Sequence, residues 1–153
     1  MKYTARIIWE KSKDEKFTDH RYSRKHRWSF DGGLDIKASS SPGVVPVPMS
    51  DESAVDPEEA FVAAISSCHM LFFLSIAAGK SYVVESYEDQ AEGIMGKNER
   101  GERAMTNITL RPRVVFSDVF NAPDAEQISE LHSLAHRRCF LANSVQSKIN
   151  ISL

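Results

Sequence analysis

The sequence has few cysteines and no excess of charge of one sign. Each of these two features excludes some classes of protein. Only two cysteines, Cys68 and Cys139, occur in 153 residues, whereas a small secreted domain held by disulfides usually carries more. Lysine and arginine (19) nearly balance aspartate and glutamate (21). A near-neutral chain has no strong field to attract nucleic acid or an anionic membrane. We therefore expect a cytoplasmic protein that binds neither, with cysteines that are either inert core residues or a redox pair.

No repeat, low-complexity segment or secretory signal is evident either. The first residues alternate like a strand and do not form a charged region followed by an apolar run. A chain of 153 residues with 42% apolar and 26% charged residues is typical of a soluble globular protein. It is long enough to bury its own core. We expect one domain over residues 1–153.

Alternating side chains predict a series of strands. Residues 24–30 alternate, Asp31-Gly32-Gly33 is a turn signal, and residues 34–37 return as a hairpin strand. The remaining segments with strand alternation are 3–9, 82–95, 105–116 and 145–153. Pro112 cannot donate a ladder hydrogen bond, so the strand over 105–116 is expected to lie at an edge or to carry a bulge. A loop over 39–55, rich in serine and proline, is long enough to carry function.

Two helices are predicted from their end signals. The sequence Asp56-Pro57-Glu58-Glu59 provides a cap, a proline at the first position and a glutamate three residues past the cap, and the apolar run that follows ends at Gly79. This helix is apolar nearly all round, which predicts burial at the centre of the fold. A membrane span is the competing interpretation, but polar residues at the middle of the run argue against it. The second helix, over 124–138, is amphipathic and turns Cys139 toward the core.

The order of strands and helices favours an α+β fold with a mostly antiparallel sheet. Within it, Cys68 is either a small buried hydrophobe or a nucleophile. A nucleophilic cysteine must be a thiolate, and it lies too far into its helix for the N-terminal dipole to help. It would therefore need a cation from another segment. The densest basic stretch is residues 21–27, which is otherwise a solvated edge strand.

Glu58 has two interpretations. Its negative charge in the first turn interacts favourably with the helix dipole, or it holds an arginine over the thiolate of Cys68. A regular helix separates the two residues by about 15 Å. If both serve one site, either the helix is broken between them or the glutamate comes from a second chain.

The histidines allow two further hypotheses. His132 and His136 are four apart and could form a metal site with the cysteines, although such a pair is common on helix surfaces. His69 follows Cys68 directly, which suggests a Cys–His hydrolase. Adjacent helix residues point about 100° apart, so His69 is badly placed as the base for Cys68.

Two motifs resemble those of one family. The segment Asp56-Pro57-Glu58-Glu59 with its apolar run to Cys68 resembles the Asn-Pro-Glu-Glu-Leu…Cys motif of the OsmC/Ohr family, whose names stand for osmotically inducible protein C and organic hydroperoxide resistance protein. Ala135-His136-Arg137-Arg138-Cys139 resembles the family's Ala-His-x-x-Cys motif. Phe30-Asp31-Gly32-Gly33-Leu34 resembles the family's turn and strand, so the resemblance covers nearly the whole chain in order.

The resemblance implies an intertwined homodimer of OsmC-like α+β fold with two sites at the subunit interface. It implies a thiol peroxidase of the oxidative stress response that reduces organic hydroperoxides to alcohols. Cys68 would be the peroxidatic cysteine and Cys139 the resolving one, joined in a disulfide that an external thiol or dithiol reduces. Arg24 is the best match for the family's arginine, with Arg21 and Arg27 as alternatives, and Glu58 matches the glutamate that orients it. No metal or organic cofactor is implied.

The chain departs from the better-known members at Phe140, where they have proline, and at His69, where many have an aromatic residue. These departures suggest a side branch of the family. Two other functions remain open: a binding module for a small hydrophobic ligand or metal, and acyl transfer through a thioester on Cys68.

Overall fold

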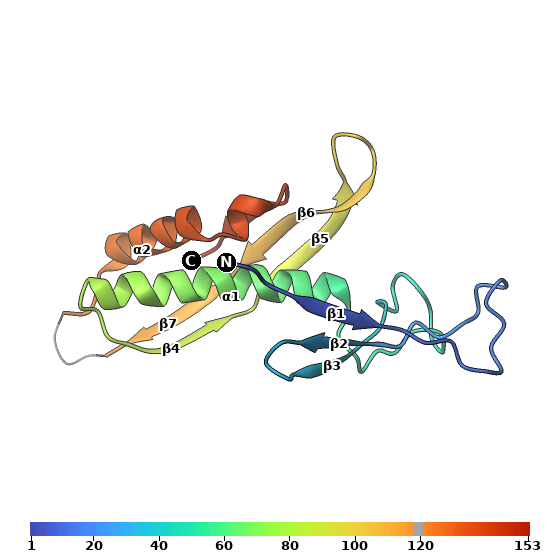
Figure 1. Ribbon diagram of the computed structural model, residues 1–153. Helices are drawn as coiled ribbons and strands as arrows, with labels where there is room; N and C mark the ends of the chain where they lie inside the picture. Colours follow the sequence, from blue (N-terminus) through green and yellow to red (C-terminus); the bar gives the residue numbers. More distant parts are fainter. Residues whose placement is uncertain (118–120) are drawn as a thin grey trace. The chain divides into compact units, whose positions relative to one another are not determined.

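The chain folds into two compact units, which cover Met1–Ala60 and Phe61–Leu153. We describe a computed structural model, in which residues 1–117 and 121–153 are described. Two helices and eight strands, with one short 3-10 helix, appear within these residues (Figure 1). The helices lie between and after runs of mostly antiparallel strands, so the predicted α+β class is confirmed. The single domain expected over 1–153 stays a prediction.

The first unit contains a three-stranded antiparallel sheet in the order β1-β2-β3. Its strands are β1 (Ala5–Ile8), β2 (His26–Phe30) and β3 (Asp35–Ala38). The predicted hairpin is confirmed, with Trp28 opposite Ile36 and a turn in which Gly33 has a φ of 84°. Glycine takes this left-handed conformation without steric cost. The predicted loop after β3 is also confirmed, since no strand or helix begins before Pro57.

Helix α1 (Pro57–Gly79) begins and ends where its sequence predicts. The backbone N–H of Glu59 donates to Asp56 Oδ1 at 2.8 Å, and the backbone N–H of Asp56 donates to Glu59 Oε2 at 3.4 Å. These reciprocal bonds satisfy two N–H groups that a helix start leaves without partners. The helix is unbroken between Glu58 and Cys68, so the first of the two explanations for a shared site does not hold.

Burial of α1 is confined to one face. Ile65, Phe73 and Ala77 are buried, but Leu71 on the other side is 60% exposed. By length and composition α1 could also cross a membrane, a test that the core helix of a soluble protein passes equally. The sequence predicted that α1 is buried on all sides. It is buried only on the face that packs on the rest of the second unit.

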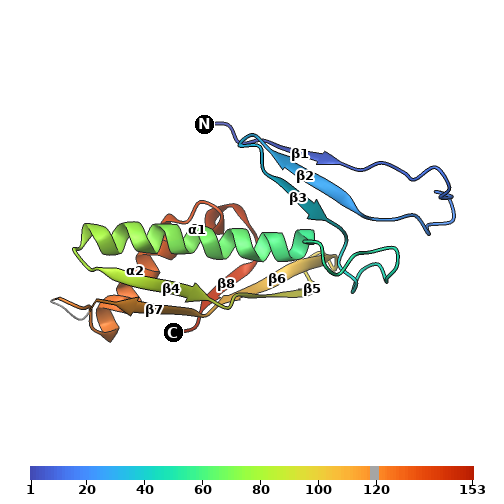
Figure 2. The ribbon, with the colours of Figure 1, turned by 90° about the horizontal axis from the view of Figure 1, so that it is seen from below.

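The second unit places α1 over two small sheets (Figure 2). One pairs β4 (Val84–Asp89) with β7 (Pro112–Phe116), and the other has the order β5-β6-β8, with β5 (Glu92–Lys97), β6 (Arg103–Leu110) and β8 (Lys148–Ile151). Ile65 packs with Ile108 and Leu110 over the second sheet. Phe73 packs with the first sheet and with helix α2 (Ala125–Arg138).

The single strand predicted over residues 105–116 is wrong. The backbone N–H of Arg111 donates to Asp89 Oδ1 at 2.6 Å instead of to a neighbouring strand. Pro112 has no N–H and begins β7 as its first residue, a position that suits proline. The chain therefore leaves one sheet at Leu110 and enters the other at Pro112. The final strand is shorter than predicted and runs parallel to β6.

Candidate functional site

The two cysteines meet in the second unit. Cys68 lies in the middle of α1 and is half-buried, and Cys139 is the fully buried residue that ends α2. Both are free thiols, and the side chain of Cys68 is near enough to Cys139 to contribute to its raised pKa. Burial, followed by the neighbouring Cys68, raises the pKa of Cys139 to about 11.

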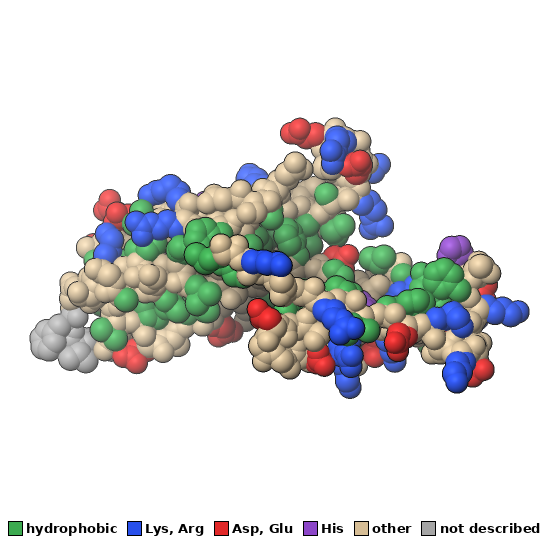
Figure 3. Space-filling view, in the orientation of Figure 1, with side chains coloured by type: hydrophobic (Ala, Val, Ile, Leu, Met, Phe, Trp, Pro, Cys, Tyr) green, Lys and Arg blue, Asp and Glu red, His purple; other side chains and the backbone are tan. Residues whose placement is uncertain are grey.

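The surroundings of the cysteines make Cys68 the accessible one. A cavity of about 530 Å³ is lined by Cys68 and by mainly apolar side chains of α1 and of the segment after Cys139, including Leu71, Phe72, Phe140 and Leu141. The rings of Phe72 and Phe140 meet edge to face with centroids 5.0 Å apart. Figure 3 shows hydrophobic side chains at the surface over α1. A small molecule with an apolar body could therefore reach the thiol of Cys68.

The second unit also contains a buried pair of histidines whose contact no sequence pattern predicted. His69 Nε2 and His132 Nδ1 are 3.0 Å apart, and each residue is 1% exposed. Burial lowers the pKa of both histidines to about 4, so both are neutral at pH 7. His132 stands four residues after Ile128 and three before the buried Ala135 on α2, and this helical spacing could have indicated its burial.

The metal hypothesis finds no support in this geometry. Within residues 1–117 and 121–153, no group of three or more histidine, cysteine, aspartate or glutamate side chains is arranged to hold a metal ion. His132 is turned toward His69 and Phe73, with which it stacks at 4.3 Å between ring centroids. His69 also bonds away from Cys68, which agrees with the argument that it is not a base for that thiol.

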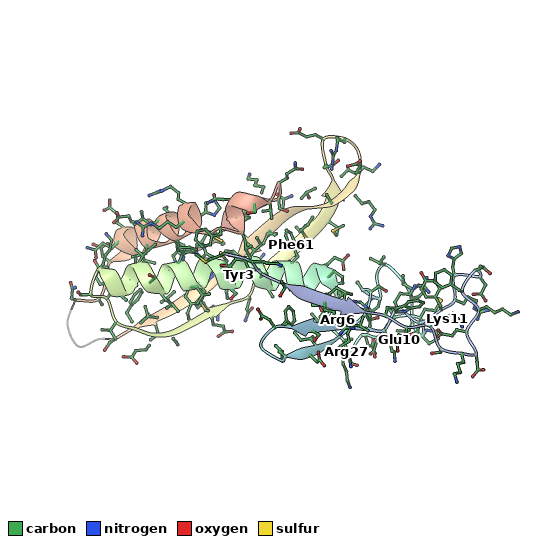
Figure 4. The ribbon with its side chains drawn as sticks, in the orientation of Figure 1. Tyr3, Arg6, Glu10, Lys11, Arg27 and Phe61 are labelled. Carbon is green, nitrogen blue, oxygen red and sulfur yellow. The ribbon has the colours of Figure 1, made fainter. Side chains whose placement is uncertain are left out.

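The three candidate arginines differ in their surroundings. Arg27 on β2 (labelled in Figure 4) is exposed. Its Nε lies 3.7 Å from Asp35 Oδ2. Arg21 is exposed as well. Arg24 is half-buried, its Nη1 donates to the carbonyls of His20 and Tyr22, and its Cζ lies 3.8 Å from the centre of the Tyr22 ring. Of the three, only Arg24 is held in one position by several contacts.

The structure leaves the predicted site in two parts. Cys68 and Cys139 are together in the second unit, whereas Arg24 and Glu58 belong to the first. Glu58 is half-buried in the first turn of α1, and along the unbroken helix about 15 Å separate it from Cys68. Among the described residues, neither Arg24 nor Glu58 forms an ion pair.

Comparison with known proteins places the chain in a family. The family model of OsmC-like proteins matches residues 50–153, a segment that contains Glu58 and both cysteines. The chain belongs to the OsmC-like protein family. An OsmC-like protein of unknown function from Vibrio cholerae is 54% identical, covers 99% of this chain and 98% of its own, and superimposes with a TM-score of 0.97. No curated protein matches.

More distant OsmC-like structures share the fold. The organic hydroperoxide resistance protein OhrB of Bacillus subtilis is 20% identical, with a TM-score of 0.64 and 98% of each chain covered. An organic hydroperoxide resistance protein of Elizabethkingia anophelis is 16% identical, with a TM-score of 0.67 over 99% of this chain and 94% of its own. Arg24 lies outside the segment that the family model matches, so the match does not bear on its predicted role.

Proposed function

We propose that this chain is a cytoplasmic thiol peroxidase that reduces organic hydroperoxides to alcohols, with Cys68 as the peroxidatic and Cys139 as the resolving cysteine. The observation that carries the proposal is the contact between one accessible and one buried thiol beside an apolar cavity. Membership of the OsmC-like family supports a redox role, and two relatives of the same fold are named organic hydroperoxide resistance proteins.

The chemistry divides into three steps. The thiolate of Cys68 attacks the terminal oxygen of the hydroperoxide, so that an S–O bond forms, the O–O bond breaks and the alkoxide leaves as an alcohol after taking up a proton. The sulfur of Cys139 then attacks the sulfenic acid on Cys68, an S–S bond forms and water leaves. An external dithiol reduces the disulfide and is itself oxidised, which returns both thiols.

The buried position of Cys139 suits the resolving role. Burial, together with the neighbouring Cys68, raises the pKa of its thiol, so Cys139 remains a weak nucleophile as long as Cys68 is in its reduced form. Oxidation of Cys68 to a sulfenic acid then presents Cys139 with an electrophilic sulfur. Because the two side chains already touch, the disulfide can form without a search by a flexible loop.

In this proposal Arg24 stabilises the thiolate of Cys68 and the departing oxygen, and Glu58 orients the arginine. The unbroken α1 supports a homodimer in which both residues come from a second copy, because one helix cannot bring Glu58 to its own Cys68. A guanidinium near a thiolate favours the charged form.

A test counts thiols after stopped-flow oxidation of the reduced protein by cumene hydroperoxide and by hydrogen peroxide. We expect the loss of two thiols per chain, much faster with the organic peroxide. Cys68→Ser is expected to abolish turnover. Cys139→Ser is expected to turn over once and then to accumulate sulfinic acid, which mass spectrometry detects as two added oxygens. Survival of both thiols in equimolar organic peroxide for minutes contradicts the proposal.

The second candidate function is a module that binds a small hydrophobic ligand, and the apolar cavity beside Cys68 is the observation that favours it. It predicts slow thiol oxidation and no disulfide, and it predicts that the isolated protein carries a ligand that native mass spectrometry detects.

A further inference from the structure

Helices α1 and α2 lie side by side in the second unit, and a buried polar contact joins them close to the cysteines (Figure 1). His69, which follows Cys68 directly on α1, bonds through Nε2 to Nδ1 of His132 at 3.0 Å. His132 stands about two turns before Cys139, and helical spacing places both on the buried face of α2. The histidine bond and the neighbouring cysteines therefore belong to one helix–helix interface.

The contacts around the bond are mainly apolar. Phe73 of α1 stacks on His132 with ring centroids 4.3 Å apart, and Phe72 meets Phe140 edge to face at 5.0 Å. Apolar contacts are not directional, and a core that is repacked with other apolar side chains loses its unique arrangement before it loses its stability. These contacts therefore hold α2 against α1 but leave the register between the helices weakly defined.

Directional contacts between the two helices are few. Within residues 1–117 and 121–153, the other polar side-chain contact of α2 near α1 is the ion pair of Glu130 with Lys80, at 3.3 Å. Both of its side chains are exposed, and a surface pair of this kind contributes little. The bond between His69 and His132 is enclosed, and a hydrogen bond restricts both distance and angle. It is therefore the contact that can define one register.

This bond has a cost for stability. Both histidines are buried, and His69 Nδ1 and His132 Nε2 have no hydrogen-bond partner among the described residues. Buried polar atoms without partners destabilise a fold, and apolar side chains at such positions are often as stable or more stable. A buried polar contact can nevertheless specify one arrangement, as a buried asparagine fixes the register of a coiled coil.

We propose that His69 and His132 are positioning residues, whose bond holds α2 in the register that places Cys139 beside Cys68. This inference rests on the proposed peroxidase function, because that register serves the closure of the disulfide. In this proposal neither histidine contacts the peroxide, and both act through the position of Cys139. The attack of Cys68 on a hydroperoxide should therefore not depend on the bond, whereas disulfide closure should.

The test separates these two steps by rapid quenching after cumene hydroperoxide is added to the reduced protein. Mass spectrometry distinguishes the sulfenic acid, which has one added oxygen, from the disulfide, which has lost two hydrogens. In the double variant His69→Leu, His132→Phe, both polar partners are replaced by apolar side chains. Its sulfenic acid should form at the wild-type rate. Closure should be slower by roughly ten- to hundredfold, the effect of a misplacement of about 1 Å.

Stability is measured in parallel, because a loosened fold could also slow closure. By urea unfolding at pH 7, the double variant should be at least as stable as the wild type. The control is Leu134→Ala, which removes a half-buried apolar side chain of α2 from the same core and leaves the bond in place. It should lower the stability without slowing closure. Opposite effects of the two variants distinguish register from stability.

Two single variants test the bond itself. His132→Asn places an amide group where Nδ1 of the imidazole lies, so it can keep a hydrogen bond to His69 Nε2. His132→Leu breaks the bond. Closure should stay near the wild-type rate in His132→Asn and should be slow in His132→Leu. Equally slow closure in both variants overturns the inference, as does wild-type closure in a folded His132→Leu protein.

An equilibrium measurement separates this inference from the peroxidase proposal, because dithiothreitol exchanges with the cysteine pair without any peroxide. The equilibrium constant for the disulfide should fall roughly tenfold or more in the double variant. Peroxide reduction with unchanged closure and an unchanged constant overturns the inference alone. A fall in the constant, in a protein that does not reduce peroxides, overturns the proposed function but leaves the positioning role of the histidines standing.

Discussion

At the scale of single residues, burial gives chemically identical groups different roles. Cys68 lines a cavity, whereas Cys139 is fully enclosed and keeps its proton to a pKa of about 11. The same effect separates the histidines. His69 and His132 are enclosed and neutral, while His20 is exposed. A charged group is costly wherever water is excluded, so the buried cysteine and the buried histidines both stay neutral at pH 7.

The buried histidines predict that acid destabilises the fold. The pKa of each is about 4 in the folded state and 6.5 ordinarily, so between these values the unfolded chain binds more protons. The free energy of unfolding should fall as the pH drops from 6.5 toward 4, by up to about 1.4 kcal/mol per pH unit for each histidine. Urea unfolding at pH 7, 6 and 5 measures this slope.

The double variant His69→Leu, His132→Phe serves as the comparison, because it removes both partners and leaves no polar atom alone. Its slope should be smaller than that of the wild type. His20→Asn changes an exposed histidine and should keep the wild-type slope. Equal slopes in all three proteins would mean that the pair is not neutral in the folded chain.

At the scale of elements, α1 organises the second unit by meeting both sheets and α2. Its first half covers β5-β6-β8 and its second half covers β4-β7, and the chain changes sheets at Pro112. The helix approaches β5 closely at Gly93. A Cβ built there would lie 2.6 Å from Val62 Cγ2 on α1 and 2.5 Å from Met105 Sδ on β6.

Gly93→Ala is therefore expected to lower the free energy of unfolding by about 1–3 kcal/mol, the usual cost of overpacking. The methionine can rotate away, but the branched Val62 is stiff and sits on the helix that carries Cys68. Urea unfolding measures the loss. Gly32→Ala is the control, because nothing lies within 4 Å of its Cβ position. A loss no larger than that of the control would show that α1 shifts freely over β5.

At the scale of the whole molecule, the proposed site is complete only if two chains share it. One face of α1 is open in the single chain, with Leu71 60% exposed beside the cavity of Cys68. Glu58 lies ten positions before Cys68 on the same unbroken helix. The homodimer proposed above would reconcile these facts with a site that both residues serve.

Mixing two inactive variants tests this arrangement. Cys68→Ser and Glu58→Gln should each lack activity. When they are co-expressed in equal amounts, half of the dimers are mixed, and one site in each then has both native residues. Activity of about a quarter of the wild-type value is expected for statistical pairing of a two-fold dimer. If the mixture stays inactive while sedimentation shows dimers, then both residues act within one chain.

Local signals in the sequence determined where the helices and most strands lie. The cap at Asp56, the turn at Gly33 and the helical spacing that buries Cys139 all depend on residues a few positions apart, so the sequence contains the whole interaction. The cysteine motifs likewise indicated the family, which the match over 50–153 confirms. The roles of Cys68, Cys139, Arg24 and Glu58 stay predictions.

The tertiary structure decided what depends on residues far apart in the chain. Alternation over residues 105–116 is compatible with one strand or with two. The backbone N–H of Arg111 donates to Asp89 instead of to a neighbouring strand, and the strand is therefore divided in two. The pairing of His69 with His132, 63 positions away, likewise has no local signal. The rings of Trp9, Phe17 and Tyr22 also meet, although Phe17 and Tyr22 lie in a loop with no periodic pattern that could predict it. Short-range sequence signals predict the helices and strands, but only the packing of distant segments determines which side chains are buried against one another.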